Sequence, residues 1–232
     1  MFHLDHFSLI TRNQSEATFR LSRETGLGSY DGGFFPKFGA GIRVIPLGED
    51  VFLEIQSLVD LDVMKRELET PSFFGQVLMK RRETFLAWCF RTDTEAELEE
   101  FSRVTGHKID REVLNYENAQ QMMNGDKNVV IEAPNALECW PQGMPNVYWW
   151  PDMTKHDSRY PVEARTGDRE PLGLAWVEVG GTEADFDAWF GGLTRAKDHP
   201  VRFNGGKHGL YALGVKTTKG EVTIRRPSLN DE

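Results

Sequence analysis

The sequence has little of what marks a disulfide-stabilised protein or a membrane protein. It contains two cysteines in 232 residues, Cys89 and Cys139, and neither belongs to a CxxC pair. Both lie in apolar or aromatic stretches, which favours buried, reduced thiols over a disulfide or a structural zinc site. No early segment resembles a signal peptide, and no run approaches the roughly 20 apolar residues of a membrane-spanning helix. We therefore expect a cytoplasmic protein without a membrane partner.

Clustered positive charge is also missing. Lys and Arg number 27 against 36 Asp and Glu, which gives a formal net charge of −9, and the basic residues are scattered. Nucleic-acid-binding proteins gather Lys and Arg on one face, so nucleic acid is not expected as a partner. The GxxxxGK[ST], GxSxG and HExxH motifs are absent as well. The hydrophobic content of 39% is sufficient for a substantial core.

A strand followed by a helix occurs three times along the chain. The copies begin at HLDHFSLIT, FLAWCFRT and LGLAWVEVGG. Each helix start places a capping side chain three positions before an acid, which is the spacing of a capping box. These pairs are Asn13 with Glu16, Thr94 with Glu97, and Thr182 with Asp185, and the expected helix ends are Gly26, Gly106 and Gly191.

Strand-like segments separated by turn residues follow each helix, so each copy is predicted to be a βαβββ unit. The predicted fold class is therefore α+β. The expected organisation is a first unit at 1–60, a connecting segment at 61–83, a second unit at 84–152, a loop at 153–170 and a third, βαβββ-like unit at 171–232.

Two strands of the first unit carry an ionisable side chain among aliphatic residues. These are His6 in FHLDHFSLIT and Glu54 in VFLEIQSLV. Counting back from the helix caps, the positions equivalent to His6 are Ala87 and Ala175, and those equivalent to Glu54 are roughly Trp149 and Thr223. Only the first unit carries the pair, which indicates a role beyond packing.

Three stretches of the first unit, LDHF, GGFFPKFG and VFLEI, resemble the vicinal oxygen chelate superfamily, and within it the larger glyoxalase-like domains. The resemblance implies curved mixed sheets of paired units around a cleft, with a divalent metal held by His or Gln on first strands and Glu on last strands. Carried over to this chain, it assigns His6 and Glu54 as metal ligands. Ala87 and Trp149 in the second unit cannot coordinate a metal, so the set of ligands from two units is incomplete.

A third ligand is therefore sought among the histidines in strand ends or loops. The candidates are His3, His156 and His208, and His208 is the first choice. One imidazole and one carboxylate can bind Mn, Fe, Co, Ni or Zn at about 2.0–2.2 Å and leave positions open for substrate oxygens. The alternative is structural: a hydrogen-bonded core histidine, and a glutamate paired with an arginine such as Arg43.

Further residues are expected to line a substrate pocket. Ser8 and Gln56 lie two positions beyond His6 and Glu54 on the same strand faces, where they can orient ligands or contact substrate. The other two candidates are Arg43, for a carboxylate or enolate on the substrate, and the aromatic Trp149.

These observations favour a metal-dependent enzyme that chelates oxygens of a small organic substrate and stabilises an enolate-like state. The reaction would be of the isomerase, lyase or ring-cleaving dioxygenase type. The alternative is a metal-free protein of the same fold that binds a small molecule for sequestration or resistance. An odd number of units leaves one without a partner, so a homodimer through the third unit is a further possibility.

Overall fold

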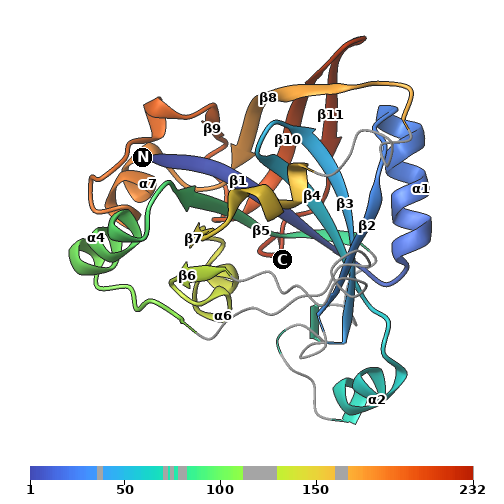
Figure 1. Ribbon diagram of the computed structural model, residues 1–232, viewed down its shortest axis with the longest axis horizontal. Helices are drawn as coiled ribbons and strands as arrows, with labels where there is room; N and C mark the ends of the chain where they lie inside the picture. Colours follow the sequence, from blue (N-terminus) through green and yellow to red (C-terminus); the bar gives the residue numbers. More distant parts are fainter. Residues whose placement is uncertain are drawn as a thin grey trace.

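The computed structural model describes residues 1–35, 39–69, 73, 76–77, 83–111, 130–159 and 167–231 (Figure 1). The elements up to residue 149 are β1 (Phe2–Thr11), α1 (Gln14–Thr25), β2 (Tyr30–Phe35), β3 (Ala40–Gly48), β4 (Val51–Leu58), α2 (Leu61–Glu69), β5 (Glu83–Thr92), α4 (Glu95–Thr105), β6 (Ile131–Ala133), α6 (Ala136–Cys139) and β7 (Asn146–Trp149). They are followed by β8 (Pro171–Val179), α7 (Glu183–Trp189), β9 (Val201–Phe203), β10 (Leu210–Thr217) and β11 (Gly220–Arg225).

The three predicted helix starts are confirmed. Asn13 accepts a hydrogen bond from the Glu16 backbone N–H, and Thr94 and Thr182 each form a complete capping box with the acid three residues later. Helices α1 and α4 end at Gly26 and Gly106, both in the left-handed conformation. These local signals can be found in the sequence because each involves groups only a few residues apart.

Seven strands form one sheet, in the order β2-β3-β4-β1-β5-β7-β6. The central strand β1 pairs parallel with β4 and antiparallel with β5, so the first and second units share a continuous sheet. This sheet curls into a half-barrel (Figure 1). The predicted α+β class and the curved mixed sheet are confirmed.

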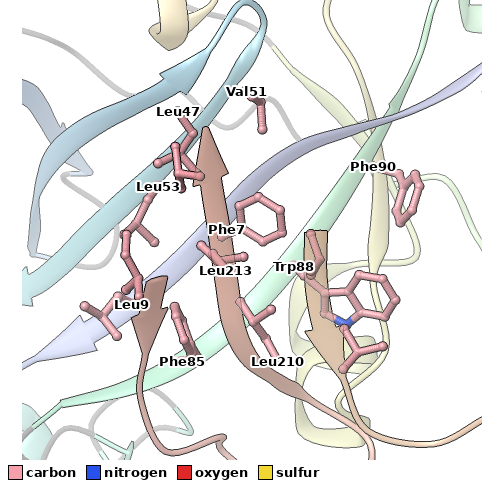
Figure 2. Packing of buried hydrophobic residues seen from close by; sticks show 14 of the residues in the cluster. Phe7, Leu9, Leu47, Val51, Leu53, Phe85, Trp88, Phe90, Leu210 and Leu213 are labelled. Atoms are coloured by element: carbon pink, nitrogen blue, oxygen red, sulfur yellow. The ribbon is translucent and has the colours of Figure 1, made fainter. Parts of the chain in front are cut away.

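The last four strands form a separate sheet, in the order β11-β10-β8-β9. This sheet packs against one face of the larger one, and Figure 2 shows Leu210 and Leu213 of β10 among Phe7, Leu9 and Phe85 of the larger sheet. Complete burial of such side chains contributes about 1.5–3 kcal/mol each. The third unit therefore covers this face of its sheet by packing against the first two units of the same chain. The homodimer stays a prediction.

Helices α1 and α4 add Leu21 and Phe101 to the same core, which therefore lies on one side of β1. The opposite side of β1 carries His6, Ser8 and Ile10, and it is buried as well. Burial of both faces explains why polar side chains on β1 need partners: an unpaired polar group there would be costly.

Parts of the sequence predictions fall outside the described residues. This applies to residues 112–129 of the second unit, to most of 70–82 in the connecting segment and to 160–166 in the loop. The described start of the connecting segment is α2, and the loop begins with two short 3-10 helices at Met153–Lys155 and Asp157–Arg159. None of the helices that the structure describes has the length and apolar character needed to cross a membrane.

Candidate functional site

Asp5 and His6 are consecutive on β1, yet both side chains reach the same buried cluster. Simple alternation would place them on opposite faces of the strand. The register between β1 and β5 shifts between Leu4 and His6, and such an irregularity turns side chains away from their regular direction. As a result, Asp5 Oδ2 lies 2.7 Å from His6 Nδ1.

The other ring nitrogen of His6 meets Glu54. His6 Nε2 lies 3.1 Å from Glu54 Oε1, and the two residues are only 4% and 7% exposed. Ser8 is the register partner of Glu54 and donates to Oε1 over 3.2 Å, while Gln56 donates to Oε2 over 2.9 Å. The structure thus brings together four of the residues selected from the sequence, with Ser8 and Gln56 holding the carboxylate.

A second histidine joins the cluster from a distant part of the chain. His156 Nε2 lies 3.0 Å from Asp5 Oδ1, and its Nδ1 lies 2.7 Å from the hydroxyl of Ser158. Trp150 also donates its indole N–H to Asp5, over 3.3 Å. The result is a buried series of hydrogen-bonding groups that runs from Glu54 through His6, Asp5 and His156 to Ser158.

Aromatic rings enclose the His6 imidazole. Phe52 of β4 stacks on it with ring centroids 5.0 Å apart, and Tyr148 of β7 lies at the same centroid distance in a tilted arrangement. The Phe52 ring also contacts the edge of His156. These contacts fix the plane of the imidazole and keep the surroundings of the ion pair apolar, which strengthens its electrostatic interactions.

The carboxylates decide the charge state of the cluster. Burial alone would lower the pKa of His6, but the neighbouring Cys89 sulfur and the hydrogen bonds to Asp5 and Glu54 raise it well above 6.5. Burial alone would raise the pKa of Asp5, but His156 and His6 hold it well below its usual range. His6 is therefore an imidazolium at neutral pH, flanked by two carboxylates.

Cys89 stands opposite His6 in the register of β1 and β5, and Ala87 stands opposite Ser8. Burial raises the pKa of Cys89 to about 11, even though His6 opposes this shift. The group is thus a neutral thiol at neutral pH, and the charge on His6 is maintained by the two carboxylates.

Beyond Tyr148 lies a further buried carboxyl group, Glu132 of β6. It is the register partner of Tyr148 and accepts from Asn146 Nδ2 over 2.6 Å and from the Ala136 backbone N–H over 3.3 Å. Burial raises the pKa of Glu132 and raises that of Tyr148 well above 10. Both groups therefore favour their neutral forms more than they would in water.

Three predicted site residues lie away from the His6–Glu54 pair. Arg43 is the register partner of Ile55 rather than of Glu54, so it faces the other side of the sheet and donates to the hydroxyl of Ser29 over 3.3 Å. Trp149 packs on the core side, and its neighbour Tyr148 contacts His6 instead. Both side chains therefore lie on the face of the sheet opposite to the His6–Glu54 pair.

The third of these residues is the proposed third metal ligand. His208 is a half-exposed residue whose Nε2 lies 3.3 Å from Asp185 of α7, away from the His6–Glu54 pair. His3 pairs with the exposed Asp93. His156, which ranked lower in the sequence analysis, is the histidine that joins the cluster, but it contacts Asp5 and not Glu54.

The donor set does not fit the divalent metal that the resemblance implies. Among the described residues, no group of three or more His, Cys, Asp or Glu side chains could hold a metal ion. The reason is geometric: Asp5 and Glu54 contact opposite nitrogens of the His6 ring, so their oxygens do not converge on one point. The described residues supply one His–Glu pair and do not complete a metal site.

One solved structure shares this fold, and two others are more distantly similar to the chain. A hypothetical protein from Staphylococcus aureus is 12% identical with a TM-score of 0.57, and the match covers 99% of this chain and 87% of that chain. Methylmalonyl-CoA epimerase from Mycobacterium tuberculosis is 12% identical with a TM-score of 0.45, and covers 64% of this chain and 88% of that chain. Methylmalonyl-CoA epimerase from Streptomyces coelicolor is 10% identical with a TM-score of 0.45, and the match covers 64% of this chain and 97% of that chain.

No curated protein matches the sequence. A family model described as a glyoxalase-like domain matches residues 4–195, which is most of the chain. The chain belongs to the glyoxalase-like domain family, within the vicinal oxygen chelate superfamily.

Proposed function

We propose that this protein is an enzyme of the isomerase or lyase type that moves a proton on a small organic substrate at the His6–Glu54 pair. The observation that carries the proposal is the 3.1 Å contact between His6 Nε2 and Glu54 Oε1 inside a buried cluster. It places a proton donor and a proton acceptor side by side. Reactions that pass through an enolate-like state need both.

The two groups would have different roles. The Glu54 carboxylate, held by Ser8 and Gln56, would accept a proton from a carbon next to a carbonyl group. The His6 imidazolium would donate a hydrogen bond from Nε2 to the carbonyl oxygen, where negative charge develops as the proton leaves. Return of the proton from Glu54 to a different carbon, or to the other face of the same carbon, would complete an isomerisation.

Metal dependence is not part of this proposal, because the described donors supply only the His6–Glu54 pair. A ring-cleaving dioxygenase needs a redox-active metal and so a more complete ligand set than this pair offers. The isomerase and lyase types need a proton donor and acceptor, which the pair supplies. This difference favours them over the dioxygenase type.

A second candidate function is metal-free binding of a small molecule without chemistry. It is favoured by the completeness of the network: both nitrogens of His6 and both oxygens of Glu54 have partners within the protein. A cluster satisfied in this way does not require a substrate for its stability. The rings of Phe52 and Tyr148 would suit a planar ligand.

The test is solvent deuterium incorporation into enolisable probes, namely phenylpyruvate, oxaloacetate and acetylacetone, followed by proton NMR. Wild-type protein is expected to accelerate exchange on at least one probe, and Glu54→Gln is expected to lose the acceleration by about 100-fold or more, as for removal of a general base. Glu49→Gln, at an exposed glutamate, is the matched control and is expected to behave as wild type. Probe binding without exchange would support the second candidate.

Elemental mass spectrometry on the same untagged protein, purified without chelator, addresses the metal. Near-stoichiometric Mn, Fe, Co, Ni or Zn that disappears in folded His6→Ala and Glu54→Ala variants would overturn the metal-free form of the proposal. Metal-free protein that still catalyses exchange would support it.

A further inference from the structure

We infer that Asp5 and His156 are positioning residues for His6: Asp5 holds Nδ1 of the His6 ring and so directs Nε2 towards Glu54, while His156 holds the second oxygen of Asp5. This inference rests on the proposed function, since it explains how the proton donor of the pair is kept in place. It assigns a role to two buried groups that the proton-transfer step itself does not use.

The first argument is the way in which the Asp5 carboxylate is held. One oxygen lies 2.7 Å from His6 Nδ1 and the other lies 3.0 Å from His156 Nε2. The Trp150 indole N–H approaches the first oxygen within 3.3 Å. A side chain that is fully buried and held at both oxygens has little freedom to rotate, so it defines the position of the His6 ring.

The second argument is the location of the hydrogens. The Ser158 backbone N–H points to His156 Nδ1 over 3.4 Å, so that nitrogen accepts and the ring hydrogen lies on Nε2, facing Asp5. His156 therefore donates from Nε2 to Asp5. His6 faces a carboxylate at each nitrogen, so each nitrogen carries a hydrogen. The hydrogen on Nε2 is the one directed at Glu54.

The third argument is charge balance across the elements that face this cluster. Around His6 these are the carboxylates of Asp5 and Glu54 and the neutral groups Cys89 and Tyr148. Around Asp5 they are His6, His156, Trp150 and Arg91, whose Nη1 lies 3.6 Å from Oδ1. The carboxylates of Asp5 and Glu54 therefore face the cations of His6 and Arg91, and a buried network needs charges paired in this way.

Some of the groups that hold Asp5 come from outside the strands of the site. His156 and Trp150 belong to the segment between β7 and β8, which is tied to the turn between β3 and β4 by an ion pair of Arg159 with Asp50, at 2.8 Å between Nη2 and Oδ2. The orientation of His6 thus depends on a segment about 150 residues away in sequence. Displacement of that segment would remove the hydrogen bonds of His156 and Trp150 to Asp5, and Asp5 would then hold the His6 ring less firmly.

The test is NMR titration of the ring nitrogens in protein labelled with 15N-histidine. In wild type, both nitrogens of His6 are expected to be protonated at neutral pH. Asp5→Asn is expected to lower the pKa of His6 by at least about one unit, a tenfold change in the protonation equilibrium. Asp93→Asn removes the partner of the exposed His3 and is the matched control, expected to leave His6 unchanged.

His156→Gln is the conservative variant, because a side-chain amide can still donate to Asp5, and it is expected to leave His6 doubly protonated at neutral pH. The inference is overturned if His6 of wild type carries a single hydrogen at neutral pH, or if folded Asp5→Asn leaves its pKa unchanged. Should Asp5→Asn fail to fold, the wild-type titration and His156→Gln decide. No substrate is needed, so failure of the exchange assay leaves this result standing.

Discussion

At the scale of single residues, the site depends on a buried cation between two buried anions. The desolvation cost of such groups is offset only when each keeps its partners, so the removal of one member is costly. Glu54→Gln retains the size of the side chain but leaves the His6 imidazolium with one carboxylate instead of two. The loss is electrostatic and does not create a cavity.

We therefore expect Glu54→Gln to lower the free energy of unfolding by about 1–3 kcal/mol in urea titrations. The matched substitution Glu49→Gln, at an exposed position in the turn after β3, is expected to stay within about 0.5 kcal/mol of wild type. Equal effects of the two substitutions would contradict the buried-pair interpretation.

The thiols provide another prediction at this scale. Cys89 and Cys139 are both free and buried, and burial raises the pKa of Cys89 to about 11. Because the thiolate is the reactive form, neither cysteine is expected to react with a chromogenic disulfide reagent in the native protein near neutral pH. Unfolding in guanidinium is expected to expose both. Rapid labelling of one thiol without unfolding would contradict this expectation.

At the scale of elements, two glycines with similar backbone conformations differ in how closely another segment approaches them. Gly106 and Gly143 both have positive φ, 79° and 71°. A Cβ on Gly143 would lie 2.2 Å from the carbonyl oxygen of His208, whereas one on Gly106 would meet nothing within 4 Å. The two positions share the backbone strain of a left-handed residue but differ in space.

Gly143→Ala is therefore expected to destabilise the protein by about 1–3 kcal/mol more than Gly106→Ala, measured as the difference in free energy of unfolding. Gly106→Ala serves as the control for backbone strain alone, at about 1 kcal/mol. Equal stability of the two variants would contradict the close approach of Gly143 to the backbone of His208.

At the scale of the whole molecule, the shifted groups predict how stability depends on pH. The raised pKa of His6 means that its contribution is complete below about pH 6.5, the ordinary histidine value, and is lost as pH rises through the higher pKa of the folded state. Cys89 acts in the same direction: the unfolded thiol ionises from about pH 9, and the folded thiol only at about 11.

Stability is therefore expected to fall steadily on the alkaline side, as followed by urea unfolding at a series of pH values. The Cys89 share of this loss is about 2–3 kcal/mol between pH 9 and 11. Cys89→Ser removes the ionisable thiol and is expected to reduce the slope over that interval. An unchanged slope would show that another group accounts for it.

The sequence by itself determined what depends on neighbouring residues: the starts of the three capped helices, the strand before each of them, and the period of two that put Ser8 with His6 and Gln56 with Glu54. Only the tertiary structure decided the rest. The register shift that turns Asp5 towards His6, the faces taken by Arg43 and Trp149, and the approach of His156 from a remote segment depend on contacts between residues far apart in sequence. Such contacts are set by packing and strand register, which local patterns do not encode.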